Sequence, residues 1–170
     1  MNKTITRNVV SLAALALAIA ASGSAIAADA TAQATGTVIS PIDITKSADL
    51  VFGSFASGAT GGTVTVSTLG VRGKTGDVAL FGSAGAAAKF DVTGEGGLTY
   101  SIVLVPTALT RSGGTETMSF TAQSDIPSGT LAGTGASGAQ SFFVGGELTV
   151  AAGQAPGTYA GSVTATVAYN

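Results

Sequence analysis

Cysteine, histidine and tryptophan are all absent from this chain of 170 residues. Without cysteine there are no disulfide bonds, so strand pairing and side-chain packing must supply the stability of the fold. Without cysteine and histidine, most zinc and copper sites and every histidine-based catalytic triad are excluded. The chain therefore lacks two of the side chains that enzymes use most often, and we expect it not to be an enzyme.

Charge is also scarce, at 9% of the residues. Two of the seven basic side chains, Lys3 and Arg7, lie in the first 27 residues. Residues 28–170 contain the five remaining basic side chains and nine acidic ones, which gives this part a net charge of −4. This balance provides neither a basic footprint for nucleic acid nor a polybasic patch for anionic lipid.

The first 27 residues have the pattern of a signal peptide. A basic start is followed by an apolar run over 9–21, interrupted only by Ser11, and Ala25 and Ala27 form a small-x-small cleavage site. A membrane anchor is the alternative, but the apolar run is shorter than the 18 or more residues that a spanning helix needs. We therefore predict export, cleavage before Ala28, and a mature chain without a membrane span.

Residues 28–170 have the composition and periodicity of an all-β domain. Of the chain's 25 glycines, 24 lie in this part, and with abundant Thr, Ser, Ala and Val they disfavour long helices. Glycine-rich breaks at 58–62, 94–97, 111–114 and 133–138 separate short apolar-alternating segments, and Gly145-Gly146 suggests a bulge. The pattern predicts one sandwich or barrel domain, with nine strands at about 32–39, 48–52, 63–68, 77–81, 87–93, 98–104, 116–122, 141–150 and 158–169.

Acidic side chains are the remaining candidates for chemistry. A pair of them can act as general acid and base, but nothing in their spacing marks a pair or a calcium loop. Gly94 to Gly97 is not followed by a predicted helix and so is not expected to bind phosphate. We assign no catalytic, cofactor-binding or metal-binding residue among Asp43, Asp49, Asp77, Asp91, Glu95, Glu116, Asp125 and Glu147.

The segment 28–39 alternates small apolar residues with threonine and glutamine. One face carries Ala30, Ala32, Ala34, Gly36 and Val38. Such a strand can slide into a shallow groove between two sheets, where main-chain hydrogen bonds add about 0.5–1.5 kcal/mol each. The sequence leaves two interpretations open: an intermolecular donor strand, or an ordinary first strand that pairs within its own chain.

The last predicted strand alternates just as clearly. Its apolar face carries Tyr159, Val163, Ala165, Val167 and Tyr169, while threonines dominate the other face. A strand of this kind at the edge of a sheet can pair with another chain.

Both ends of this domain resemble known proteins. Residues 34–53, ATGTVISPIDITKSADLVFG, resemble a family of secreted bacterial proteins of unknown function related to spore-coat-U-like proteins and to the pilins of chaperone–usher fimbriae. Residues 155–170 resemble the final strand of the same group, in which a glycine often stands fourteenth from the end and a tyrosine is penultimate. Gly157 and Tyr169 occupy those positions. Many pilins carry a disulfide, which this chain lacks.

The resemblance implies an immunoglobulin-like β-sandwich that is incomplete and is completed by a donor strand. A periplasmic chaperone would lend that strand, and the N-terminal segment of a neighbouring subunit would replace it at an outer-membrane usher. The predicted function is then a structural subunit of a pilus- or fimbria-like surface fibre, exported to the periplasm and then to the cell surface.

Two other functions remain open. A self-contained secreted β-sandwich could act as an adhesin-like, surface-binding module, which clustered exposed aromatics would support. Phe142-Phe143 is the one adjacent aromatic pair, and one of its rings must be buried. An eight-stranded outer-membrane barrel would need strands of about 9–11 residues, and most predicted strands are shorter.

Overall fold

The computed structural model describes residues 26–83 and 85–170. The chain divides into two units, Met1–Thr37 and Val38–Asn170. In the first, the described residues 26–37 form neither helix nor strand. Nearly all of the predicted signal peptide lies outside the described residues. No helix in the described part of the chain has the length and hydropathy needed to cross a bilayer.

The second unit is built from antiparallel strands, which confirms the prediction of an all-β sandwich. Inward apolar positions alternate with outward polar ones, as in β4, where Ala88, Phe90 and Val92 are buried. The described strands are β1 (Asp43–Ala48), β2 (Ser54–Val66), β3 (Arg72–Phe81), β4 (Ala88–Gly96), β5 (Thr99–Pro106), β6 (Leu109–Arg111), β7 (Thr117–Met118), β8 (Phe120–Ser124), β9 (Ser128–Thr130), β10 (Gly135–Val150), β11 (Tyr159–Ala160) and β12 (Val163–Tyr169).

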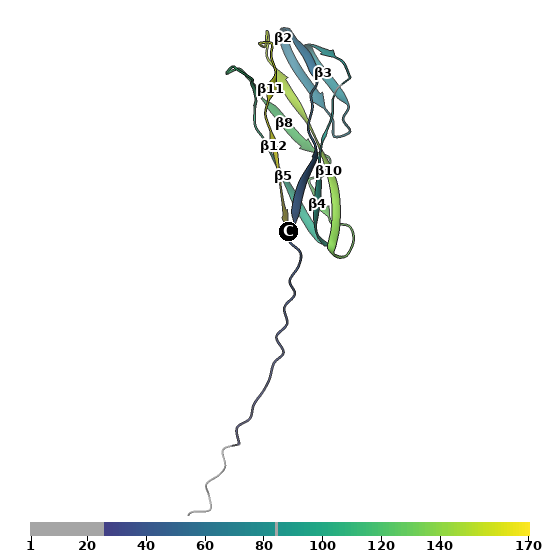
Figure 1. The fold of residues 1–170 in the computed structure, drawn as a ribbon, viewed down its shortest axis with the longest axis vertical. Helices are drawn as coiled ribbons and strands as arrows, with labels where there is room; N and C mark the ends of the chain where they lie inside the picture. The colour runs from purple at the N-terminus through teal and green to yellow at the C-terminus, as the bar shows by residue number, and fades with distance from the viewer. Residues whose placement is uncertain (1–25, 84) are drawn as a thin grey trace, which may run out of the picture. The chain divides into compact units, whose positions relative to one another are not determined.

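Strand β10 organises the large sheet because it pairs with three other strands. Residues 135–144 pair with β4, residues 146–150 with β2, and residues 144–148 with β8. β1 extends this sheet beyond β4, and β3 extends it beyond β2. Figure 1 shows β10 running along much of the sandwich.

The bulge predicted at Gly145-Gly146 is wrong. β10 changes partner there, from β4 to β2, and its register shift lies between Gly135 and Gly138. Glycine is needed at 145 because a Cβ atom would collide with the carbonyl of Val66 on β2.

Two three-stranded sheets, β12-β5-β9 and β11-β6-β7, complete the sandwich around two apolar clusters. The first cluster joins the large sheet to β7, and β6 and β11 pack against it: Phe52, Val64, Val66, Val78, Met118, Phe120, Leu148 and Val150. The second joins β4 and β10 to β5, and β1 and β12 pack against it: Ala88, Phe90, Val92, Tyr100, Leu131, Phe142 and Val144.

Several predicted strand boundaries are wrong. Residues 49–53 form no strand apart from a single bridge between Val51 and Ala86, although a strand was expected over 48–52. The glycine-rich stretch 58–62 lies inside β2 and produces a register shift in place of a break. The last predicted strand is divided into β11 and β12, which pair with different strands.

Candidate assembly site

An open groove of about 1000 Å³ lies between residues 46–57 and residues 154–163. Its apolar lining comes from both clusters of the sandwich and includes Phe52, Phe90, Met118, Phe120 and Leu148. Lys46 and Asp49 are the charged residues of the described lining, and they pair with each other at 2.5 Å. The lining also carries polar side chains, including Ser54, Ser57, Gln154, Thr158 and Ser162, so the groove combines apolar surface with hydrogen-bonding groups.

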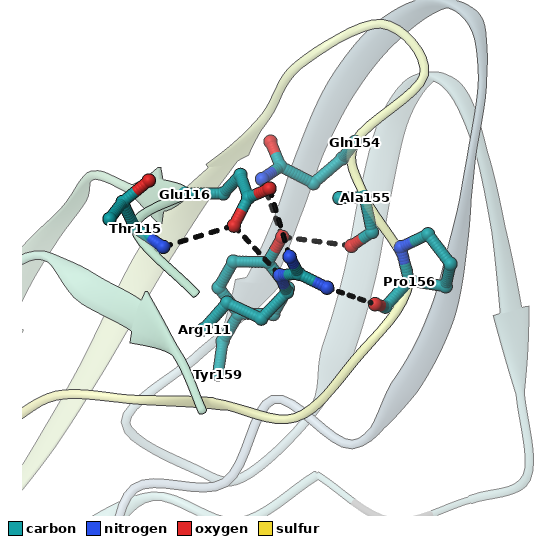
Figure 2. Close-up of polar contacts among 7 residues, drawn as sticks. All are labelled: Arg111, Thr115, Glu116, Gln154, Ala155, Pro156 and Tyr159. Carbon is teal, nitrogen blue, oxygen red and sulfur yellow. Dashed lines mark hydrogen bonds and ion pairs between the residues drawn. The ribbon is translucent and has the colours of Figure 1, made fainter. Parts of the chain in front are cut away.

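One wall of the groove, residues 154–159, is held by Arg111 at the end of β6 (Figure 2). The guanidinium binds Glu116 with two hydrogen bonds of 2.8 and 3.0 Å and donates a third, of 3.5 Å, to the carbonyl of Pro156. These charge-assisted hydrogen bonds raise the pKa of Arg111 and lower the pKa of Glu116.

Tyr159 and Gly157 fit this wall closely. The Tyr159 hydroxyl accepts a hydrogen bond from Gln154 and donates one to the carbonyl of Ala155, both 2.8 Å long (Figure 2). Gly157 has a φ of 152°, and a Cβ atom there would lie 2.9 Å from Cδ of Arg111. A glycine at 157 therefore lets this wall of the groove lie against Arg111. This is a physical reason for the glycine of the C-terminal motif.

At the far end of β12, Tyr169 ties three segments together. Its hydroxyl accepts a 2.6 Å hydrogen bond from the backbone N–H of Glu95 and donates a 3.0 Å bond to the carbonyl of Ser40. The Glu95 carboxylate in turn accepts a 3.1 Å bond from the N–H of Ser40. A side chain at Gly94 would collide with the Tyr169 hydroxyl. The start of the domain is therefore fixed beside the end of β12.

The edge of β12 away from β5 has no strand partner among the described residues. Asn170 donates its N–H to Thr99, and the carbonyl of Ser162 accepts from Thr107, so residues of even number face the β5 side. In an antiparallel pair, the N–H and C=O of one residue point the same way and alternate along the strand. The main-chain groups of Val163, Ala165, Val167 and Tyr169 therefore point to the open edge.

This edge lacks the protection that other edges of the molecule carry. Among the described edge strands with six or more residues, β1 carries Asp43 and Lys46, and β3 carries Arg72, Lys74 and Asp77. β12 carries no charge, no proline and no bulge. Charged residues, prolines and bulges are the devices that keep edge strands from pairing with other chains.

The predicted C-terminal assembly residues are brought together, whereas the predicted N-terminal ones are not. Tyr159 and Val163 line the groove, and the side chains of Val163, Ala165, Val167 and Tyr169 are half-buried in the predicted phase. Ala30, Ala32, Ala34 and Gly36 lie in the separate unit, and Val38 is 98% exposed.

The prediction of a strand over 32–39 is wrong for the single chain. The first strand of the described residues begins at Asp43. Its small side chains offer little apolar area to bury, and no strand of the described chain pairs with it.

Two anchors of the site were not predicted from the sequence: the Arg111–Glu116 pair and the Ser40–Glu95–Tyr169 link. The first had a detectable signal. The break at Arg111 to Gly114 predicts a turn, and opposite charges on either side of a tight turn are placed to meet. The second joins residues 55 and 129 positions apart and has no local signal.

The acidic residues examined as catalytic candidates do not converge in the structure. Among the described residues, no three His, Cys, Asp or Glu side chains are grouped as metal ligands. Asp91 lies on the outer side of β4, where it accepts hydrogen bonds from Ser141 and Ser47 and pairs with Lys89 at 3.0 Å.

The sequence profile of a family described as a domain of unknown function (DUF4402) matches residues 42–169. This chain belongs to the DUF4402 family. The match begins one residue before β1 and ends with β12, so it covers the sandwich and leaves the segment 28–39 outside. No curated protein matches the chain.

Proposed function

We propose that this DUF4402 protein is a structural subunit of a surface fibre that assembles by donor-strand exchange. In this proposal, an extended segment of a neighbouring subunit occupies the groove and pairs with the open edge of β12. The observation that carries the proposal is the combination of a groove with apolar and hydrogen-bonding groups in its lining and an adjoining uncharged strand edge. Partners of the subunit would be copies of the same or a similar chain, with a periplasmic chaperone and an outer-membrane usher before assembly.

The energetics favour a strand as the occupant. Four residues of β12 direct their N–H and C=O groups outward, and each new main-chain hydrogen bond contributes about 0.5–1.5 kcal/mol. Each buried CH₂ equivalent of the incoming side chains adds about 0.8 kcal/mol. A strand would satisfy the open edge and cover the apolar floor together, which a small polar ligand would not do.

The segment 28–39 is the donor that the chain itself offers. It lies outside the family match, forms no strand in the described residues, and carries small side chains at alternate positions. It also precedes Ser40, which is fixed to the sandwich through Glu95 and Tyr169. A fibre built this way has each donor segment joined directly to a firmly held domain.

A matched pair of substitutions tests this function. Ala34→Asp would place a carboxylate in the groove without a partner, which costs about 3–5 kcal/mol, whereas Thr35→Asp lies on the opposite face of the segment. We expect Ala34→Asp to leave secretion intact and abolish multimers, and Thr35→Asp to retain them. The readout is a gel of the secreted protein run with and without boiling.

Two results would contradict donor-strand exchange through this segment. One is equal behaviour of the two variants. The other is wild-type protein that remains monomeric throughout and forms no boiling-sensitive multimers. Either result would favour a self-contained β-sandwich acting as an adhesin-like module.

A further inference from the structure

The groove has one wall whose middle is not held by strand pairing. Residues 151–158 form no strand, and backbone hydrogen bonds tie this stretch to the sandwich near its two ends. The N–H of Gly153 donates to the carbonyl of Gly58 at 3.1 Å, and the carbonyl of Thr158 accepts a 2.8 Å bond from Ser112. Between these two ties, the position of the wall depends on side-chain contacts.

Arg111 contacts the middle of this wall without lining the groove itself (Figure 2). Its guanidinium donates the 3.5 Å hydrogen bond to the carbonyl of Pro156. A Cβ atom at Gly157 would lie 2.9 and 3.0 Å from two carbons of the arginine side chain, so the backbone there rests on its aliphatic stem. Pro156 and Gly157 both line the groove. The arginine therefore supports the wall without touching the space that an occupant would fill.

Glu116 fixes the direction of the guanidinium. The turn between them brings the two residues together, since the N–H of Arg111 donates to the carbonyl of Glu116 at 2.9 Å. An isolated surface ion pair contributes little to stability, but the two bonds of 2.8 and 3.0 Å make this pair bidentate and so set its geometry. The carboxylate is hydrogen-bonded to Arg111 and to the N–H of Thr115. It can therefore influence the wall only through the arginine.

We infer, given the donor-strand exchange proposed above, that Arg111 is a positioning residue for the incoming strand and that Glu116 acts through it. The pair holds the wall at the distance from residues 46–57 that lets a strand enter. Without the guanidinium, the wall loses its support at Pro156 and Gly157, while the strand ladders and both apolar clusters keep their contacts. The groove should then bind a strand more weakly in a domain that is still folded.

The test measures strand binding by a domain that does not insert its own segment. The receiver is the full mature chain carrying Ala34→Asp, and the probe is a synthetic peptide of residues 28–39, titrated by calorimetry. The variants are Arg111→Ala, Glu116→Gln and the two combined. The control, Lys74→Ala, also removes a positive charge, from an exposed position of β3 that does not line the groove.

We expect Lys74→Ala to bind the peptide with the Kd of the parent. Arg111→Ala should raise the Kd by about tenfold, and Glu116→Gln by a smaller factor, because the guanidinium then loses its orientation but keeps its stem. The combined variant should match Arg111→Ala alone, since two residues that act in series are not additive. A merely structural role would lower the melting temperature and leave the Kd of the folded protein unchanged.

Equal peptide binding by the parent and Arg111→Ala would overturn the inference and leave donor-strand exchange standing. Additive losses in the combined variant would also overturn it, because Glu116 would then act without the arginine. If Arg111→Ala does not fold, Glu116→Gln decides the question, and a Kd equal to that of Lys74→Ala would overturn the inference. A parent that binds no peptide, with a wild-type chain that forms no boiling-sensitive multimers, would overturn donor-strand exchange itself, and the inference with it.

Discussion

Tyr169 fixes the end of β12 to the start of the domain at Ser40 and to the end of β4 at Glu95. Its hydroxyl serves the backbone of both Ser40 and Glu95, and the ring is half-buried against the second apolar cluster. The sequence placed this side chain in the apolar phase of the last strand, and the structure adds the two hydrogen bonds.

Tyr169→Phe keeps the ring and removes the hydroxyl. We expect a loss of about 1–3 kcal/mol in the free energy of unfolding, because a partly buried N–H and C=O lose their partner. Urea denaturation of the monomer measures it, with Tyr169→Ala expected to lose more because ring packing is lost as well. Wild-type stability in Tyr169→Phe would show that water replaces the hydroxyl without cost.

A second prediction for a single residue concerns the pKa of Asp91. Hydrogen bonds from Ser141 and Ser47, with Lys89 beside them, lower the pKa of its carboxyl from 3.8 to about 2. A depressed pKa in the folded state means that the carboxylate stabilises the fold above about pH 4, and that this contribution is lost as the pH falls toward 2.

Carboxyl carbon shifts followed by NMR should therefore give Asp91 a titration midpoint of about 2. Ser141→Ala should raise that midpoint, since the Ser141 hydroxyl is the largest cause of the shift. A midpoint near 4 in the folded wild-type protein would show that these hydrogen bonds do not persist in solution.

Strand β12 has one edge that is unpaired in the described residues. Its N–H groups point alternately to this open edge and to β5, which permits a controlled test. The N–H of Val167 points to the open edge, whereas the N–H of Thr166 points to β5. Proline has no N–H and is tolerated on the outward side of an edge strand, but it removes a ladder hydrogen bond on the inward side.

We expect Thr166→Pro to destabilise the monomer by about 1–3 kcal/mol, because a ladder hydrogen bond to β5 is lost and its acceptor is left unpaired. Val167→Pro should cost clearly less and still prevent multimers, since it removes a donor needed by the incoming strand. Chemical denaturation and the boiling-sensitive gel give the two readouts. Multimers of Val167→Pro at the wild-type level would place the contact elsewhere.

The sequence predicted strands correctly where the apolar alternation was strong. It failed where the presence of a pairing partner decided whether a segment formed a strand. Ala88, Phe90 and Val92 are inward as predicted because side-chain phase follows directly from alternation. Residues 49–53 carry apolar side chains but line the groove without forming a strand. The stretch 58–62 stays within β2 because β3 pairs with Ser57 and Gly62 on either side of a register shift. Alternation does not identify the pairing partner, so it could not predict either outcome.

At the scale of the whole molecule, the chain consists of a family domain and a segment before it. The fold class and the final strand could be predicted from the sequence, because both are written in local periodicity. The groove could not, because its walls join residues near 50 to residues near 157. The open edge of β12 also depends on long-range pairing, and only the absence of charge along it was visible in advance.

Export is a separate prediction at this scale. The apolar run ending in Ala25-Ile26-Ala27 predicts cleavage before Ala28. N-terminal sequencing of the secreted protein should read Ala-Asp-Ala-Thr. Protein that still begins at Met1 would contradict both the exported location and the fibre.

In the proposed fibre, β12 receives a strand from another copy of the chain, and amide hydrogen exchange tests this contact most directly. In the monomer, the amides of Ala165 and Val167 should exchange fast, while those of Thr164, Thr166 and Ala168, which face β5, exchange slowly. In isolated multimers, Ala165 and Val167 should become protected, and the even-numbered residues should change little. Unprotected Ala165 and Val167 amides in the multimer, or amides already protected in the monomer, would contradict the account.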